Sequence, residues 1–213
     1  MIAKIQRKIG HSSEDQLTWD FFGALRYLPF DLGLRRILQK SVYPEGCLDN
    51  LNLSASEWPQ GIYFWPHYTH LSRKEPDLVI VLDHVAILIE VKQHSPLSGE
   101  SQLSYEAELL TELFPEKEKV LLLLAKESDA HDIYAAAKSE IEDKHSNVRF
   151  GYCTWQKVWA ALKRISPRDT FQKIIVQDLI DLLTHKEFKR FESFEMDDEI
   201  NGEIQEGLFY AFQ

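Results

Sequence analysis

The stretch that decides the fold spans residues 76–92 and reads PDLVIVLDHVAILIEVK. It contains two apolar runs, residues 77–82 and 85–92, which are rich in β-branched side chains and separated only by Asp83 and His84. Two such runs joined by two polar residues predict a β-hairpin, although Asp-His is a weaker two-residue turn than Asp-Gly. A hairpin with this turn fixes which side chains of the two strands lie opposite one another.

Three ionisable side chains gather at the open end of this hairpin. Counting back from the turn places Asp77 opposite Glu90, and directly opposed residues project from the same face of a sheet. Lys92 lies two residues beyond Glu90 and therefore shares that face. Two neighbouring carboxylates repel each other unless a cation compensates, and Mg²⁺ binds such oxygens together with water and phosphate. The pattern favours a metal site for phosphodiester hydrolysis, in which Lys92 acts on a metal-bound water, over a plain salt bridge at the strand ends.

The spacing of these residues resembles a known motif. An Asp preceded by Pro, at position 77, is followed thirteen residues later by Glu90-Val91-Lys92, which is similar to the motif of the PD-(D/E)XK nuclease superfamily. The resemblance covers about residues 10–160 and implies the restriction-endonuclease-like fold, an α/β domain with a mixed central β-sheet flanked by helices. It further implies that Asp77, Glu90 and the backbone carbonyl of Val91 bind Mg²⁺, for which Mn²⁺ can substitute, and that Lys92 works on the attacking water.

Two more residues join the candidate site through this resemblance. Glu14 lies at the inward edge of a helix predicted over residues 12–28, where many superfamily members carry an acid that binds the metal or positions water. Its alternative role is a favourable interaction with the helix dipole. Gln102 begins a helix predicted over residues 100–113, where several branches place a Gln that faces the site; the alternative is an exposed helix residue. Glu106 follows on the same helix face, four residues later.

The rest of the chain predicts helices and strands in alternation around the hairpin. Periodicity predicts helices over residues 12–28, 31–41, 100–113, 133–143, 155–164 and 170–184, and short apolar runs predict strands over residues 62–65, 120–125 and 149–154. This order predicts one α/β domain, residues 1–190, around a mixed sheet. Residues 191–213 follow as an acidic tail that also contains aromatic residues.

The formal net charge of −10 argues against a nucleic-acid ligand, because proteins that bind phosphate tend to be basic. Seven of the acids lie in the tail, from residue 192 onward, where there is no Lys or Arg. The body is nearer to neutral and contains four small basic clusters, each of which can be read as solvated surface charge. These clusters are Lys4/Arg7/Lys8, Arg35/Arg36/Lys40, Lys163/Arg164/Arg168 and Lys186/Lys189/Arg190.

Two further observations bear on the class of protein. Cys47 and Cys153 share no motif spacing with each other or with histidine, so neither a disulfide framework nor a zinc finger is expected. The N-terminus has no apolar run of signal-peptide length, and the longest apolar stretches are too short to span a bilayer. We therefore expect a cytoplasmic protein that does not contact a membrane.

The leading hypothesis is a Mg²⁺-dependent nuclease. The resemblance alone favours DNA over RNA as the substrate and suggests a place in bacterial restriction, repair or phage defence. One alternative is a catalytically silent module with the same fold that binds nucleic acid or a protein partner, and another is a small-molecule phosphohydrolase. The aromatic residues of the tail suggest that it packs against the body, a protein partner or a second copy of the chain.

Overall fold

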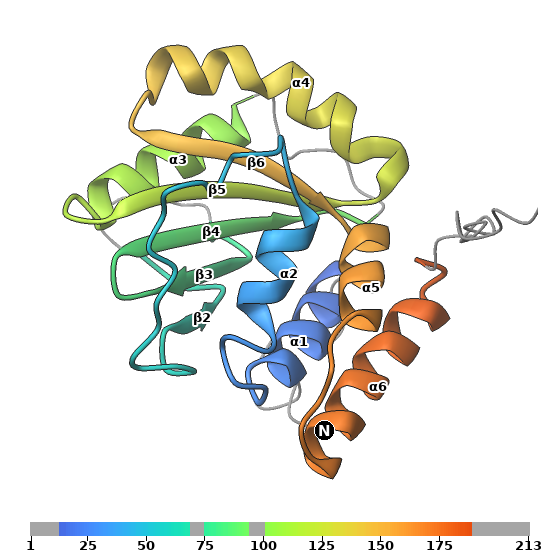
Figure 1. Ribbon diagram of the computed structural model, residues 1–213. Helices are drawn as coiled ribbons and strands as arrows, with labels where there is room; N and C mark the ends of the chain where they lie inside the picture. The colour runs from blue at the N-terminus through green and yellow to red at the C-terminus, as the bar shows by residue number, and fades with distance from the viewer. Residues whose placement is uncertain (1–12, 69–74, 94–100, 189–213) are drawn as a thin grey trace, which may run out of the picture.

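A six-stranded mixed β-sheet with helices on both faces organises the computed structural model, which describes residues 13–68, 75–93 and 101–188 (Figure 1). The strand order across the sheet is β1-β6-β5-β4-β3-β2. The strands are β1 (Val42–Tyr43), β2 (Ile62–Phe64), β3 (Leu78–Val81), β4 (Val85–Val91), β5 (Glu118–Ala125) and β6 (Val148–Thr154). The helices are α1 (Ser13–Leu25), α2 (Leu34–Ser41), α3 (Gln102–Leu113), α4 (Glu127–Lys144), α5 (Trp155–Lys163) and α6 (Thr170–His185). The expectation of a mixed sheet flanked by helices is confirmed.

The predicted hairpin is formed by β3 and β4. The strands pair antiparallel from Leu78 opposite Ile89 to Val81 opposite Ala86, and the Leu82 N–H donates to the Val85 carbonyl at 2.8 Å. This register is the one that a turn at Asp83 and His84 predicts.

Hydrogen bonds from a residue outside the hairpin stabilise the turn. The Asp83 carboxylate accepts hydrogen bonds from the Ser56 N–H at 2.9 Å and from the Ser56 hydroxyl at 2.8 Å. These bonds lower the pKa of Asp83 and hold the carboxylate in place. The contacts explain how a turn of modest intrinsic preference is kept.

Strands β4, β5 and β6 run parallel in the centre of the sheet. Every residue of β4 is buried, and so is every residue of β5 after Glu118, because helices cover both faces. Alternate side chains enter two separate cores. Residues such as Ile87 and Leu122 contact the core under α1, α2, α5 and α6, whereas Leu88 and Leu121 contact the core under α3 and α4 (Figure 1).

Several boundaries differ from the expected ones. The predicted strand at residues 62–65 is β2, which ends at Phe64 and lies at one edge of the sheet. Helix α4 begins six residues earlier than predicted, at Glu127, because its first turns are polar and carry no apolar stripe except the buried Ala130. Strand β1 lies at the opposite edge and was not predicted. The tail at residues 191–213 lies outside the described residues.

None of the described helices is both long enough and apolar enough to cross a membrane.

Candidate functional site

The open end of the β3–β4 hairpin brings Asp77 and the end of β4 together. Asp77 directly precedes β3, and its Oδ2 accepts a hydrogen bond from the Val91 N–H at 2.9 Å. Its carbonyl oxygen accepts another from the Trp65 N–H at 3.2 Å. The Asp77 side chain thus continues the ladder between the two strands beyond the last paired residues. The Val91 N–H fixes its carboxylate, and the Trp65 N–H fixes its backbone.

Glu90 is the centre of the polar cluster. It is 2% exposed and lies in a strand that is otherwise apolar. Its Oε1 accepts from the Lys92 ammonium at 2.7 Å and from the Gln102 amide at 2.5 Å. Its Oε2 is buried and has no hydrogen-bond partner among the described residues. One oxygen of this carboxylate is therefore fully engaged, and Glu90 also forms a side-chain hydrogen bond with Glu106 that requires a proton on one of the two carboxyl groups.

Helix α3 contributes two buried polar residues to the cluster. The Gln102 amide nitrogen donates to Glu106 Oε1 at 3.0 Å in addition to Glu90. Gln102 is 7% exposed and Glu106 is 4% exposed, so the reading of Gln102 as an exposed helix residue is wrong. Glu106 was not assigned to the site from the sequence. The available signal was its spacing of four residues from Gln102, which places both on one helix face.

The first turn of α1 approaches the same cluster. Glu14 is close enough to Lys92 to raise the pKa of that lysine, and Asp15 is close enough to Asp77 to raise the pKa of that carboxyl. Both acids are partly exposed. The structure therefore brings the predicted Glu14 near the site, together with Asp15, which the sequence analysis did not single out.

The cluster holds more acid than base. Burial and the neighbouring Glu90 raise the pKa of Asp77 well above its usual range, against the lowering effect of the Val91 N–H and Lys92. Burial and Glu90 likewise raise the pKa of Glu106. Burial acts to lower the pKa of Lys92, but Glu90, Asp77 and Glu14 together outweigh it and the pKa is raised. The partly buried Asp77 and the buried Glu90 and Glu106 share one ammonium, and this imbalance disfavours full ionisation unless another cation is present.

The residues fit a hard divalent cation. Mg²⁺ in proteins is held by one or two carboxylates and completes its shell with water and phosphate. Asp77 and Glu90 supply the carboxylates, and the unpaired Glu90 Oε2 is a buried oxygen that such a cation would satisfy. The Val91 carbonyl lies on the same side of β4 as its N–H, toward Asp77, because a residue in an antiparallel pair directs both groups to one neighbour. Within the described parts of the chain, no group of three or more His, Cys, Asp or Glu side chains that could hold a metal ion is present.

Comparisons with known proteins give no match to this chain among models of protein families, curated proteins or solved structures. Its candidate function is therefore inferred from the motif and from the geometry around Glu90.

Proposed function

We propose that this protein is a Mg²⁺-dependent phosphodiester hydrolase with a restriction-endonuclease-like fold, and that it cleaves DNA. The observation that supports this most is the pair Asp77 and Glu90, which lie on one face of a buried hairpin beside Lys92, with one Glu90 oxygen unpaired. Asp77, Glu90 and the Val91 carbonyl would hold the metal, and Glu14 stands near enough to interact with the water around it.

When bound, the metal would polarise the scissile phosphate and supply an activated water for attack. The Lys92 ammonium is anchored on Glu90 at 2.7 Å, so it is directed to the same place as the metal-binding carboxylate. From there it orients the attacking water and offsets the negative charge that builds up on the phosphate.

Gln102 and Glu106, on α3, position the Glu90 side chain. A single amide nitrogen of Gln102 joins the two carboxylates, which restricts the side-chain rotation of Glu90. A metal-binding side chain that is already held in one orientation loses less conformational entropy when the metal and the substrate bind. In this proposal neither Gln102 nor Glu106 needs to touch the substrate.

The test is cleavage of single-stranded DNA, duplex DNA and RNA with Mg²⁺ or Mn²⁺, in the unsubstituted chain and in Asp77→Asn and Lys92→Met. Each substitution is expected to lower the rate by about a hundredfold or more, the loss typical for a group that stabilises charge in the transition state. Glu142→Gln, on the outer face of α4, is the matched charge control and should cleave normally. Cleavage that persists unchanged in both site variants would sink the proposal.

A catalytically silent module is the second candidate, and one observation favours it. Lys92, Gln102 and Glu106 already satisfy much of the hydrogen bonding around Glu90, as a purely structural network would. Calorimetric titration with Mn²⁺ separates the two candidates. Binding that Asp77→Asn weakens supports the metal centre, whereas no binding, or binding that is indifferent to this substitution, supports the silent module.

A further inference from the structure

The outward face of α2 carries a concentration of positive charge. Leu34, Ile37 and Leu38 of this short helix are buried against the core, which leaves Arg35, Arg36, Gln39 and Lys40 on the other side. Helix α5 packs alongside α2 (Figure 1). Residues of the two helices border a groove with a volume of about 410 Å³. Arg164, which follows α5, lines the groove from the opposite side.

Most of the charge in this groove is uncompensated. Four cations line it and Asp31 is the only acid in its lining. Asp31 binds Arg35 at 2.8 Å. Arg36, Lys40 and Arg164 are exposed, and within the described residues none of them forms an ion pair. Three positive charges that repel one another in one concavity, on a chain of net charge −10, create a local potential that favours an anion.

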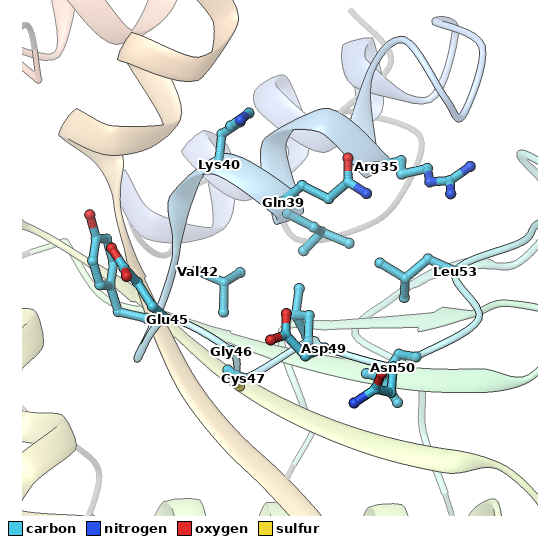
Figure 2. A pocket seen from close by; sticks show the side chains of 14 residues that line it. Arg35, Gln39, Lys40, Val42, Glu45, Gly46, Cys47, Asp49, Asn50 and Leu53 are labelled. Atoms are coloured by element: carbon cyan, nitrogen blue, oxygen red, sulfur yellow. The ribbon is translucent and has the colours of Figure 1, made fainter.

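A second hollow on the other side of α2 shows that this charge is confined to one side. Figure 2 shows that hollow between α2 and the loop that follows β1, with a volume of about 530 Å³. Arg35 and Lys40 border it, but so do Glu45 and Asp49. Two acids match the two cations there, so that hollow does not select an anion. Lys40 borders both hollows, whereas Arg36 and Arg164 line only the groove beside α5. The excess of positive charge lies on the side that faces α5.

The groove and the candidate metal centre lie on opposite faces of the sheet, because Glu90 projects toward α3 whereas α2 and α5 cover the other face, and the edge at which β4 ends connects the two. Helix α5 starts where β6 ends, at the same sheet edge as the end of β4, because β4, β5 and β6 are parallel. Two strand spacings separate β4 from β6, which is roughly 10 Å. Arg164 then follows along the helix by roughly 15 Å. The resulting separation is on the order of 20 Å, shorter than one turn of B-DNA at about 34 Å.

We propose that the groove between α2 and α5 binds the phosphate backbone of the nucleic acid on which the metal centre acts; this inference rests on the proposed function. Arg36 and Arg164 can each grip a phosphate through two parallel N–H donors, and Lys40 adds a point charge. A duplex that lies across the sheet edge would contact the metal centre and the groove at once. Contacts to phosphate carry no sequence information, so the contribution of such contacts is the same for every sequence.

The experiment measures the binding of a fluorescent 30-base-pair duplex to the full chain by anisotropy, in EDTA to prevent cleavage, over a series of salt concentrations. The test variant is Arg36→Gln/Lys40→Gln/Arg164→Gln. The control, Lys138→Gln/Lys144→Gln/Lys173→Gln, makes the same change in net charge on α4 and α6. Each phosphate contact contributes about 0.9 to the slope of log K against log salt. The magnitude of that slope should therefore be smaller by about 2–3 in the test variant, which should also bind the duplex at least tenfold more weakly. The affinity of the control variant should stay within about twofold of that of the unsubstituted chain.

Four results would overturn the proposal that this groove binds the phosphate backbone. The first is that the unsubstituted chain does not bind the duplex measurably. The second and third are that the test variant binds the duplex as tightly as the unsubstituted chain, or that the control variant loses as much affinity as the test variant. The fourth is that the substitutions weaken binding of a polyglutamate peptide and not of the duplex, which would indicate an acidic protein partner. Failure of the nuclease proposal looks different. If the chain binds with the expected slope but cleaves nothing, the proposed binding groove is supported and the proposed nuclease function is rejected. If the chain cleaves DNA but the test variant binds as well as the unsubstituted chain, only the nuclease proposal is supported.

Discussion

Replacing Glu106 with Gln should make the metal-free protein more stable at neutral pH. Glu106 is 4% exposed, and one of its oxygens accepts a hydrogen bond from Gln102 at 3.0 Å. When both Glu106 and Glu90 are ionised, the other oxygen has no donor among the described residues, because its hydrogen bond with Glu90 requires a proton. A glutamine has nearly the same shape and still accepts that bond. Its NH₂ group can also donate to Glu90, which the carboxylate cannot do.

The magnitude follows from the unpaired buried oxygen. Leaving such a group unsatisfied costs about 1–3 kcal/mol or more. Removing the charge at Glu106 should therefore stabilise the protein by about that amount, which corresponds to roughly 2–12 °C in Tm for a chain of this length.

The pH dependence has a definite sign. Burial raises the pKa of Glu106 in the folded state, so between its ordinary value of 4.5 and that raised pKa the folded protein holds more protons than the unfolded chain. The free energy of unfolding must fall as pH rises through this window. Glu106→Gln removes this contribution. The fall due to Asp77, whose pKa is raised for the same reason, remains.

The assay is urea denaturation in EDTA at pH 5, 6, 7 and 8. The stability curve of Glu106→Gln should decline less steeply with pH than that of the unsubstituted protein, by up to about 1.4 kcal/mol per pH unit. Glu108→Gln is the control, because Glu108 is exposed on the same helix. Curves that decline in parallel, or a Glu106→Gln variant less stable at pH 7, would refute the reasoning.

Three more outcomes are expected. Trp155→Ala should destabilise the protein by about 3–5 kcal/mol in urea melts, because the indole is fully buried between Phe21 and Phe188; a loss under 1 kcal/mol would contradict that packing. Burial raises the pKa of the half-buried Cys47 to about 11 and that of the buried Cys153 to about 12, so iodoacetamide at pH 8 should label Cys47 slowly and Cys153 only after urea unfolds the chain; rapid labelling of both thiols in the native protein would count against these raised pKa values. Gly151→Ala should cost about 1–3 kcal/mol, because the new Cβ would lie 2.7 Å from the Tyr43 carbonyl oxygen and 2.8 Å from the Cys47 sulfur; an unchanged melting temperature would show that the β1 segment yields freely.

The hairpin could be predicted from the sequence because its determinants are local. Two apolar runs and a two-residue turn specify the register, and with it the position of Asp77 opposite Glu90. The central strand β5 was recognisable for a related reason, since its run from Val120 to Ala125, which is covered on both faces, is apolar throughout.

The features that were missed depend on partners far away in the chain. Strand β1 has only two residues, and its pairing with β6 joins positions such as Val42 and Cys153 that no local pattern connects. Glu106 was overlooked as a site residue because a polar residue on an amphipathic helix normally faces solvent. Here that face of α3 lies over Glu90, and only the folded structure shows that the contact is buried.

The bond from the Val91 N–H to the Asp77 carboxylate has a consequence for how the protein opens. Strand β4 is buried along its whole length in the middle of the sheet, so this amide should exchange with solvent deuterium only when the sheet itself separates. Local fluctuations of loops or helix ends would leave the carboxylate in place. The geometry around Asp77 should therefore persist up to the global unfolding transition and disappear with it in a single step.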